Sequence, residues 1–208
     1  MRSLVLSRSN FPLLVIAVVA LALLIAPYPG ASFSVVATRL ITSIGSALAG
    51  VSFLSDGFLM LLAAVTAAAL VWAWHAAPER RPATVFASLG VAAAYAVSEG
   101  AKPLIGQLRP CTQWPTAGEC PIADFSLPSN HATLAFAAVW VIALATQRVW
   151  LVILATSIAL IVAIGRVLEG MHYVHDVAAG VLVGLMVPAL LTAAGLTWER
   201  ARRASRRQ

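Results

Sequence analysis

Long hydrophobic segments separated by short polar stretches dominate the chain. They run from Phe11 to about Tyr28, from Gly57 to His75, from Ala83 to about Ser98, from His131 to Thr146, from Val149 to Ile164 and from Val177 to about Trp198. Runs of this length approach what a helix needs to cross the hydrocarbon core of a membrane. Because a helix satisfies its own backbone hydrogen bonds in lipid, the pattern predicts an all-α polytopic membrane protein with six transmembrane helices.

Residues 31 to 56 break this pattern. They are apolar but carry Arg39, Asp56 and many Ser, Thr and Gly, and such charges are costly at the bilayer centre. We therefore expect an amphipathic segment lying in the interface on the outer side. The first hydrophobic segment is followed by a poor signal-cleavage site, which favours an uncleaved anchor.

Composition narrows the class of protein. Apolar residues make up 61% of the chain, charged residues 11%, and the mean hydropathy is +0.90. These values exclude a soluble globular enzyme, a disordered chain and a collagen-like fibre. The net charge of +6 could suggest nucleic acid, but the arginines cluster at the ends of apolar segments, as in membrane proteins with positive cytoplasmic loops. No nucleic-acid partner is expected.

The cations also predict the orientation. With a cytoplasmic N-terminus, six spans place ten of the 14 cations inside and leave Arg39, Lys102, Arg109 and Arg166 outside. We expect one membrane-embedded domain over residues 1–208, with a basic cytoplasmic tail at 199–208 that contacts the inner leaflet. A prokaryotic inner (plasma) membrane suits such a chain, and the outer loops are extracytoplasmic.

The first polar set lies in one of these outer loops. Lys102 and Arg109 are seven residues apart and share a face if the stretch is helical. An arginine can grip two phosphate oxygens while a lysine adds a point charge. Alone, the spacing is weak evidence and is better explained by cations reaching toward the interface.

The second set is Pro128-Ser129-Asn130-His131, directly before an apolar segment. The N-terminus of a helix offers free N–H groups to an anion. Ser129 also has the simpler interpretation of an N-cap. His131 can give a proton to a leaving oxygen.

The third set runs from Gly165-Arg166 to His172 and Asp176. On a helix the carboxylate of Asp176 could accept a hydrogen bond from His172, four residues earlier, leaving the other ring nitrogen basic and nucleophilic. Zinc bound by His172, His175 and Asp176 is the alternative, but no cysteine or further acid completes that set. We expect no metal and no cofactor.

In this order the three sets, Lys-x6-Arg-Pro, Pro-Ser-x-His and Arg-x5-His-x3-Asp, resemble the type-2 phosphatidic acid phosphatase family, which shares its active site with vanadium haloperoxidases. The resemblance implies a metal-independent phosphatase in which His172 attacks phosphorus, Asp176 orients His172 and His131 protonates the leaving oxygen. It also implies phosphate binding by Lys102, Arg109, Ser129, Asn130 and Arg166. Two positions depart from the family pattern, because Asn130 replaces a glycine and Gly165 a serine. Asparagine tolerates a left-handed backbone, which would keep an amide directed at phosphate.

Cys111 and Cys120 fall in the outer loop between the first two sets. An oxidising compartment allows a disulfide there, which would stabilise the loop by about 2 to 3 kcal/mol. Glu99 and Asp124 have no assigned role, and partnering a site cation is the simple interpretation of either.

These expectations favour a phosphatase that acts on a membrane lipid at the outer leaflet, with a polyprenyl (undecaprenyl) diphosphate as the first substrate hypothesis. Phosphatidate or phosphatidylglycerophosphate is the alternative. A phosphate or lipid transporter would not need the two histidines, and a vanadium-dependent oxidase would have a large soluble scaffold that this chain lacks. The sequence predicts no oligomeric state.

Overall fold

The computed structural model describes residues 10–25, 32–48, 50–116, 120–121 and 124–206. Its elements are the helices α1 (Phe11–Ile25), α2 (Phe33–Gly45), α3 (Val51–Ala76), α4 (Arg81–Ile105), α5 (Asn130–Thr146), α6 (Val149–Leu168) and α7 (Val174–Ser205), with the 3-10 turns η3 (Pro78–Arg80) and η4 (Pro110–Thr112). The described part contains no strand, so the all-α class is confirmed.

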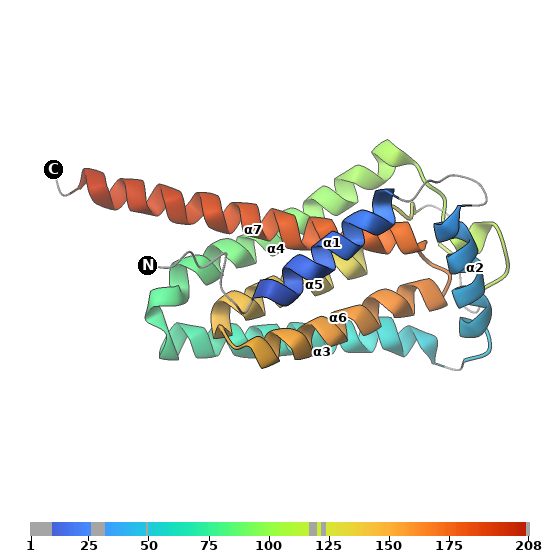
Figure 1. Ribbon diagram of the computed structural model, residues 1–208, viewed down its shortest axis with the longest axis horizontal. Coiled ribbons are helices and arrows are strands. Elements are labelled where there is room, and N and C mark those ends of the chain that lie inside the picture. The colour runs from blue at the N-terminus through green and yellow to red at the C-terminus, as the bar shows by residue number, and fades with distance from the viewer. Residues whose placement is uncertain (1–9, 26–31, 49, 117–119, 122–123, 207–208) are drawn as a thin grey trace.

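Six helices run roughly along the long axis of the molecule, whereas α2 lies across the end opposite the C-terminus (Figure 1). Four stretches are long and apolar enough to cross a membrane: Val51–Ala76, Pro78–Thr112, Val149–Leu168 and Val174–Ser205. The helices α1 and α5 have only 15 and 17 residues. Length and composition therefore support four spans. They do not establish the predicted six spans or the interfacial outer segment, which stay predictions.

Several predicted boundaries need correction. The second span begins at Val51 rather than Gly57, so Asp56 lies inside α3 and not in the segment before it. The helix predicted to end near Trp198 continues through Ser205, which makes most of the basic tail helical. The end of the first segment near Tyr28, and the cations Arg2, Arg8 and Arg207, lie outside the described residues.

The centre of the bundle is α5, whose side chains are buried almost all round by α3, α4, α6 and α7. Its contact with α7 depends on small residues, because a Cβ added to Gly184 would come within 2.3 Å of the carbonyl oxygen of Thr133. Close helix approach of this kind is typical of membrane bundles. It brings the start of α7 beside the start of α5.

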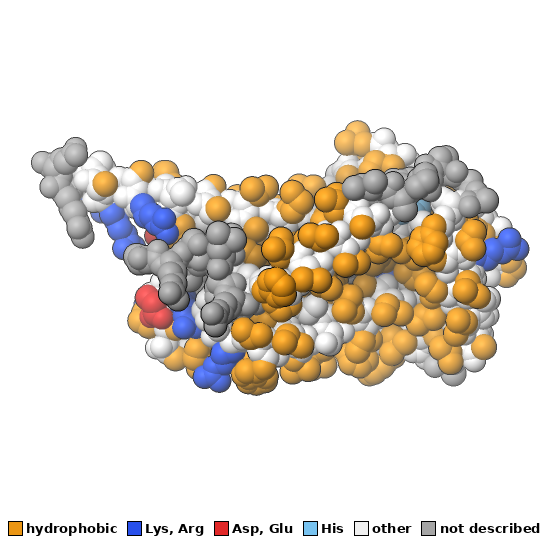
Figure 2. All heavy atoms as spheres, in the orientation of Figure 1, with side chains coloured by type: hydrophobic (Ala, Val, Ile, Leu, Met, Phe, Trp, Pro, Cys, Tyr) orange, Lys and Arg blue, Asp and Glu red, His pale blue; other side chains and the backbone are white. Residues whose placement is uncertain are grey.

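The outer surface is apolar along its length. Hydrophobic side chains cover the middle of the face in Figure 2, and Lys and Arg gather mainly at the end that carries the C-terminus. Exposed large side chains include Met60, Leu89, Val18 and Leu190. Such a surface suits lipid rather than water.

Candidate active site

The three polar sets predicted from the sequence meet at the end of the bundle opposite the C-terminus. Lys102 lies in the last turn of α4, Arg109 in the loop that follows, Ser129 at the N-cap of α5, and His172 between α6 and α7. The N–H of Ser129 donates to the carbonyl of Asp176 at 3.0 Å, which ties the second set to the third.

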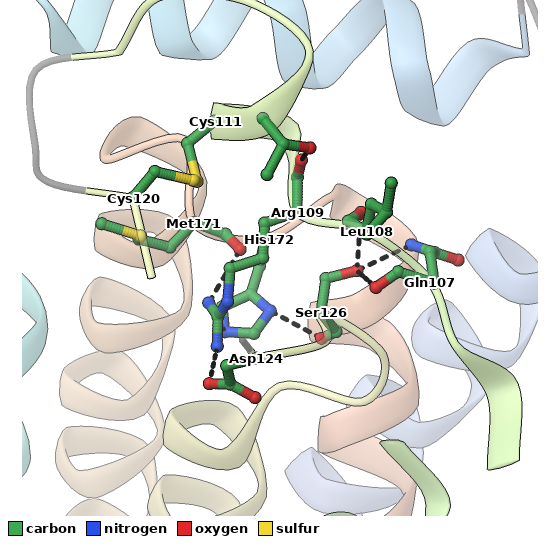
Figure 3. Close-up of a disulfide and its surroundings, with 10 residues drawn as sticks. Gln107, Leu108, Arg109, Cys111, Cys120, Asp124, Ser126, Met171 and His172 are labelled. Atoms are coloured by element: carbon green, nitrogen blue, oxygen red, sulfur yellow. Dashed lines mark hydrogen bonds and ion pairs between the residues drawn. A yellow bond between two sulfur atoms is a disulfide. The ribbon is translucent and has the colours of Figure 1, made fainter. Parts of the chain in front are cut away.

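His172 is buried, with 2% of its surface exposed. Its Nδ1 lies 2.8 Å from the carbonyl oxygen of Ser126 (Figure 3). Because a carbonyl only accepts, Nδ1 carries the proton and Nε2 keeps its lone pair. That lone pair faces Nη1 of Arg109 at 3.3 Å. Burial first, and then the charges of Arg109 and Arg166, hold the pKa of His172 well below its usual value, so the ring is neutral at neutral pH.

The expected hydrogen bond between His172 and Asp176 is replaced by other contacts. The two side chains are 3.6 Å apart, longer than a hydrogen bond, because α7 begins only at Val174 and the helical i,i+4 geometry does not extend back to His172. Asp176 instead accepts from the N–H of Tyr173 at 2.7 Å and from Nε2 of Gln107 at 2.8 Å. It fixes the turn that carries His172 rather than the imidazole itself.

His131 has a partner that the sequence did not reveal. Its Nε2 donates to the carboxylate of Asp56 at 2.9 Å, from the start of α3, and the two side chains are 26% and 62% exposed. We had assigned Asp56 to the interfacial segment. A lone carboxylate near the start of an apolar helix was the available signal, because acids in membrane-spanning segments are rare and usually paired.

Two carboxylates, Glu99 and Asp124, form ion pairs with the cations of the first set, as that simple interpretation predicts. Nζ of Lys102 lies 2.8 Å from Glu99 and 3.3 Å from Asp124, and Nη2 of Arg109 also binds Asp124 (Figure 3). Burial alone would raise the pKa of Asp124, but the hydrogen bond and charge of Arg109, helped by Lys102, bring it below its usual value. Asp124 therefore stays ionised between the two cations.

Arg166 pairs with Glu169, three residues later, at 2.7 Å. Glu169 also accepts a hydrogen bond from the hydroxyl of Ser55 on α3. Burial raises the pKa of Glu169, although the charge of Arg166 acts to lower it. The pair fixes the guanidinium at the edge of the site without using all of its donors.

Three buried donors around the site have no hydrogen-bond partner within the described residues. They are Nε of Arg109, Nε of Arg166 and the hydroxyl of Ser129. Ser129 holds the predicted N-cap position of α5, but its side chain makes no capping hydrogen bond. Unsatisfied buried donors are costly. Their convergence with the N-terminus of α5 suits an anion.

The two departures from the family pattern have structural counterparts. Asn130 starts α5 in helical conformation, not the left-handed one we expected, and its side chain binds Ser98 and Glu99 on α4. Gly165 allows α6 to approach α3, because a Cβ there would lie 3.0 Å from the backbone nitrogen of Ser55.

Cys111 and Cys120 are joined by a disulfide in the structure, with their Cα atoms 5.6 Å apart (Figure 3). The N–H of Cys111 donates to the carbonyl of Gly170 at 3.0 Å. The bridged loop is therefore attached to the turn that holds His172.

The zinc alternative has no assembled site, since no group of three or more His, Cys, Asp or Glu in the described part of the chain is placed to hold a metal ion. His175 instead lies with its Nδ1 2.8 Å from the hydroxyl of Ser34 on α2, and its ring stacks on Tyr173.

Comparison with known proteins gives three findings. The family model described as the PAP2 superfamily matches residues 83–200. Decaprenylphosphoryl-5-phosphoribose phosphatase of Mycobacterium tuberculosis, in strains CDC 1551 / Oshkosh and ATCC 25618 / H37Rv, is 33% identical over 128 residues, which cover 62% of this chain and 70% of the relative. Among solved structures, a transmembrane PAP2-type phosphatidylglycerolphosphate phosphatase from Bacillus subtilis aligns with a TM-score of 0.49 and 19% identity, over 93% of this chain and 89% of that one.

Proposed function

The chain belongs to the PAP2 superfamily of phosphatases, and we propose that it hydrolyses the phosphate ester of a membrane lipid through a phosphohistidine intermediate. In the first step Nε2 of His172 forms a bond to the terminal phosphorus while the bond from that phosphorus to the leaving oxygen breaks; this oxygen belongs to the lipid alcohol in a monophosphate and to the inner phosphate in a diphosphate. His131 gives its proton to that oxygen. Water then attacks phosphorus, His131 takes the proton back, and the N–P bond breaks to release inorganic phosphate.

The observation that carries this proposal is the set of unpaired donors beside a neutral His172. Phosphoryl transfer depends on electrostatic positioning of the transferred group. Arg109 and Arg166 supply permanent charge, and Ser129 together with the start of α5 supplies neutral donors. Substrate phosphate would displace Asp124, whose carboxylate lies between Lys102 and Arg109 and resembles an oxyanion in charge and shape.

Asp56 takes part in the same proposal as a positioning residue. Its carboxylate holds Nε2–H of His131 at 2.9 Å, and an anion in that position stabilises the charged imidazolium that a proton donor requires. Burial of His131 opposes its charged form most strongly, followed by the charges of Arg166 and Arg109. Asp56, on α3, offsets part of this effect.

A polyprenyl substrate class is supported by the relative named as a decaprenylphosphoryl-5-phosphoribose phosphatase. We infer that this chain acts on a polyprenyl lipid that bears a terminal phosphate or diphosphate. The phosphate group is recognised at the outer face of the membrane, because the cations at the opposite end of the bundle favour the cytoplasm.

The experiment is release of inorganic phosphate by purified protein from polyprenyl diphosphate, polyprenyl phosphate, phosphatidylglycerophosphate and phosphatidate, with EDTA present. We expect the polyprenyl lipids to be the best substrates. Vanadate should inhibit by adopting the geometry of the transferring phosphoryl group. Preference for a glycerolipid would overturn the substrate class, and activity that EDTA removes and zinc or magnesium restores would overturn the metal-free chemistry.

A further inference from the structure

A groove between α3, α5 and α6 lies at the end of the bundle remote from His172. It has a volume of about 280 Å³. Most of its lining is apolar or aromatic, and it includes Val65, Ala69, Trp72, Ile142, Trp150 and Leu151. Trp150 is 60% exposed beside it. This groove plays no part in the phosphatase chemistry, and its lining matches a hydrocarbon chain.

Two cations gather at the mouth of the groove. The guanidinium carbons of Arg80 and Arg148 each lie 5.8 Å from the centre of the Trp72 ring. Arg80 is held there by a hydrogen bond from Nη1 to the carbonyl of Ala145 at 2.9 Å. Two guanidinium charges beside the same indole ring repel each other, and a nearby anion would offset this repulsion.

The protein supplies little of that negative charge. Arg80 contacts Glu79 at 3.4 Å, and the side chain of Glu79 is 68% exposed, so the pair is weak. Arg148 has no carboxylate partner within the described residues. The mouth of the groove is therefore positively charged, although its floor is apolar.

We propose that this groove binds one anionic phospholipid, with an acyl chain between α3 and α6 and its phosphate between Arg80 and Arg148. Basic pockets between membrane helices bind anionic headgroups in this way. The tryptophans Trp72 and Trp150 mark the depth at which headgroup and chain meet. The site is independent of the proposed phosphatase chemistry at the other end of the bundle.

Native mass spectrometry of the purified protein with phosphatidylglycerol or phosphatidylcholine tests the proposal. We expect the protein to retain one phosphatidylglycerol molecule in preference to phosphatidylcholine. Each of Arg80→Gln and Arg148→Gln should weaken that retention by about fivefold. Arg202→Gln is the matched control, because Arg202 lies 4.6 Å from the ring of Trp198 on α7 and does not line this groove. It should change nothing.

Equal retention of the two lipids by the unaltered protein would overturn the proposal, whether or not the variants fold. An equal loss in Arg202→Gln would also overturn it, since it would mean that any arginine on a tryptophan attracts lipid equally. Phosphate release by Arg148→Gln serves as the check that the variant is folded.

Discussion

Asp56 and His131 lie 75 residues apart in the chain and share a hydrogen bond of 2.9 Å on the open side of the site. The bond joins the start of α3 to the start of α5. Among the described residues, it places the acid that contacts the proposed proton donor on a helix that carries none of the three sequence motifs.

Asp56→Asn should lower kcat on lipid phosphates by about tenfold or more, because the donor loses its anionic partner. The same variant should lose much less activity on an activated aryl phosphate, whose leaving oxygen needs no proton. Rates on both substrates check this, with Asp56→Glu as the conservative control that should recover part of the loss. An equal loss on both substrates would assign Asp56 a purely structural role.

His172→Ala should reduce phosphate release to background while the protein stays folded in the membrane, since the imidazole is needed for covalent chemistry. Unaltered protein that is quenched in alkali during turnover should carry phosphate on a histidine, and the variant should not. Normal turnover by His172→Ala would remove it as the nucleophile.

The low pKa of His172 predicts how kcat/KM depends on pH. His172 must be neutral to attack, and burial with Arg109 and Arg166 keeps it neutral below the usual value of 6.5. As pH falls, kcat/KM should therefore persist through 6.5 and decline only at clearly lower pH. Arg109→Gln removes one of these charges, so the fall of kcat/KM at low pH (the acid limb of the profile) should move to higher pH. A limb that is already centred at 6.5 or above in the unaltered protein would contradict the assignment.

Gly165→Ser should destabilise the protein by about 1–3 kcal/mol, although the family pattern has serine there. The added Cβ would lie 3.0 Å from the backbone nitrogen of Ser55, and backbone cannot move as a flexible side chain does. Thermal unfolding in detergent measures the loss. The matched control is Gly100→Ser on α4, where an added Cβ meets nothing within 4 Å. Similar melting temperatures for Gly165→Ser and unaltered protein would show that α3 can move aside.

Cys111 and Cys120 test the orientation in the membrane. After mild reduction of intact cells, an impermeant thiol reagent should label both residues, because we place their loop outside the cytoplasm. Protein from lysed cells provides the full-labelling reference. Labelling that requires lysis would invert the topology and leave the chemistry of the site untouched.

The sequence identified the groups that carry charge or protons, but not all of their contacts. Lys102, Arg109 and His172 could be proposed because ionisable groups at the ends of apolar helices are rarely incidental, and Ser129 because it directly precedes an apolar helix. Their meeting at one end follows from alternating helix direction alone. The hydrogen bond from His172 to Ser126 could not be predicted, because it joins a side chain to the backbone of an irregular loop.

Asp56 was missed for a different reason. A carboxylate is costly at the bilayer centre, so the sequence reasoning ended the interfacial segment at Asp56 and began the span after it. In the structure α3 begins at Val51, five residues before Asp56. Asp56 therefore lies close enough to the start of the helix to pair with His131. Only the packing of α3 against α5 and α6 makes that position favourable.

The length of α5 bears on the depth in the membrane at which a lipid phosphate would meet the site. Its 17 residues rise about 26 Å, less than the hydrocarbon thickness of about 30 Å, whereas α3 has 26 residues. Because longer helices enclose α5, we expect its start to lie at the depth of the lipid ester oxygens rather than in bulk water. On the proposed function, a lipid would then be cleaved without being lifted from its leaflet, and a spacer that raises its phosphate into the aqueous phase should make it a poorer substrate.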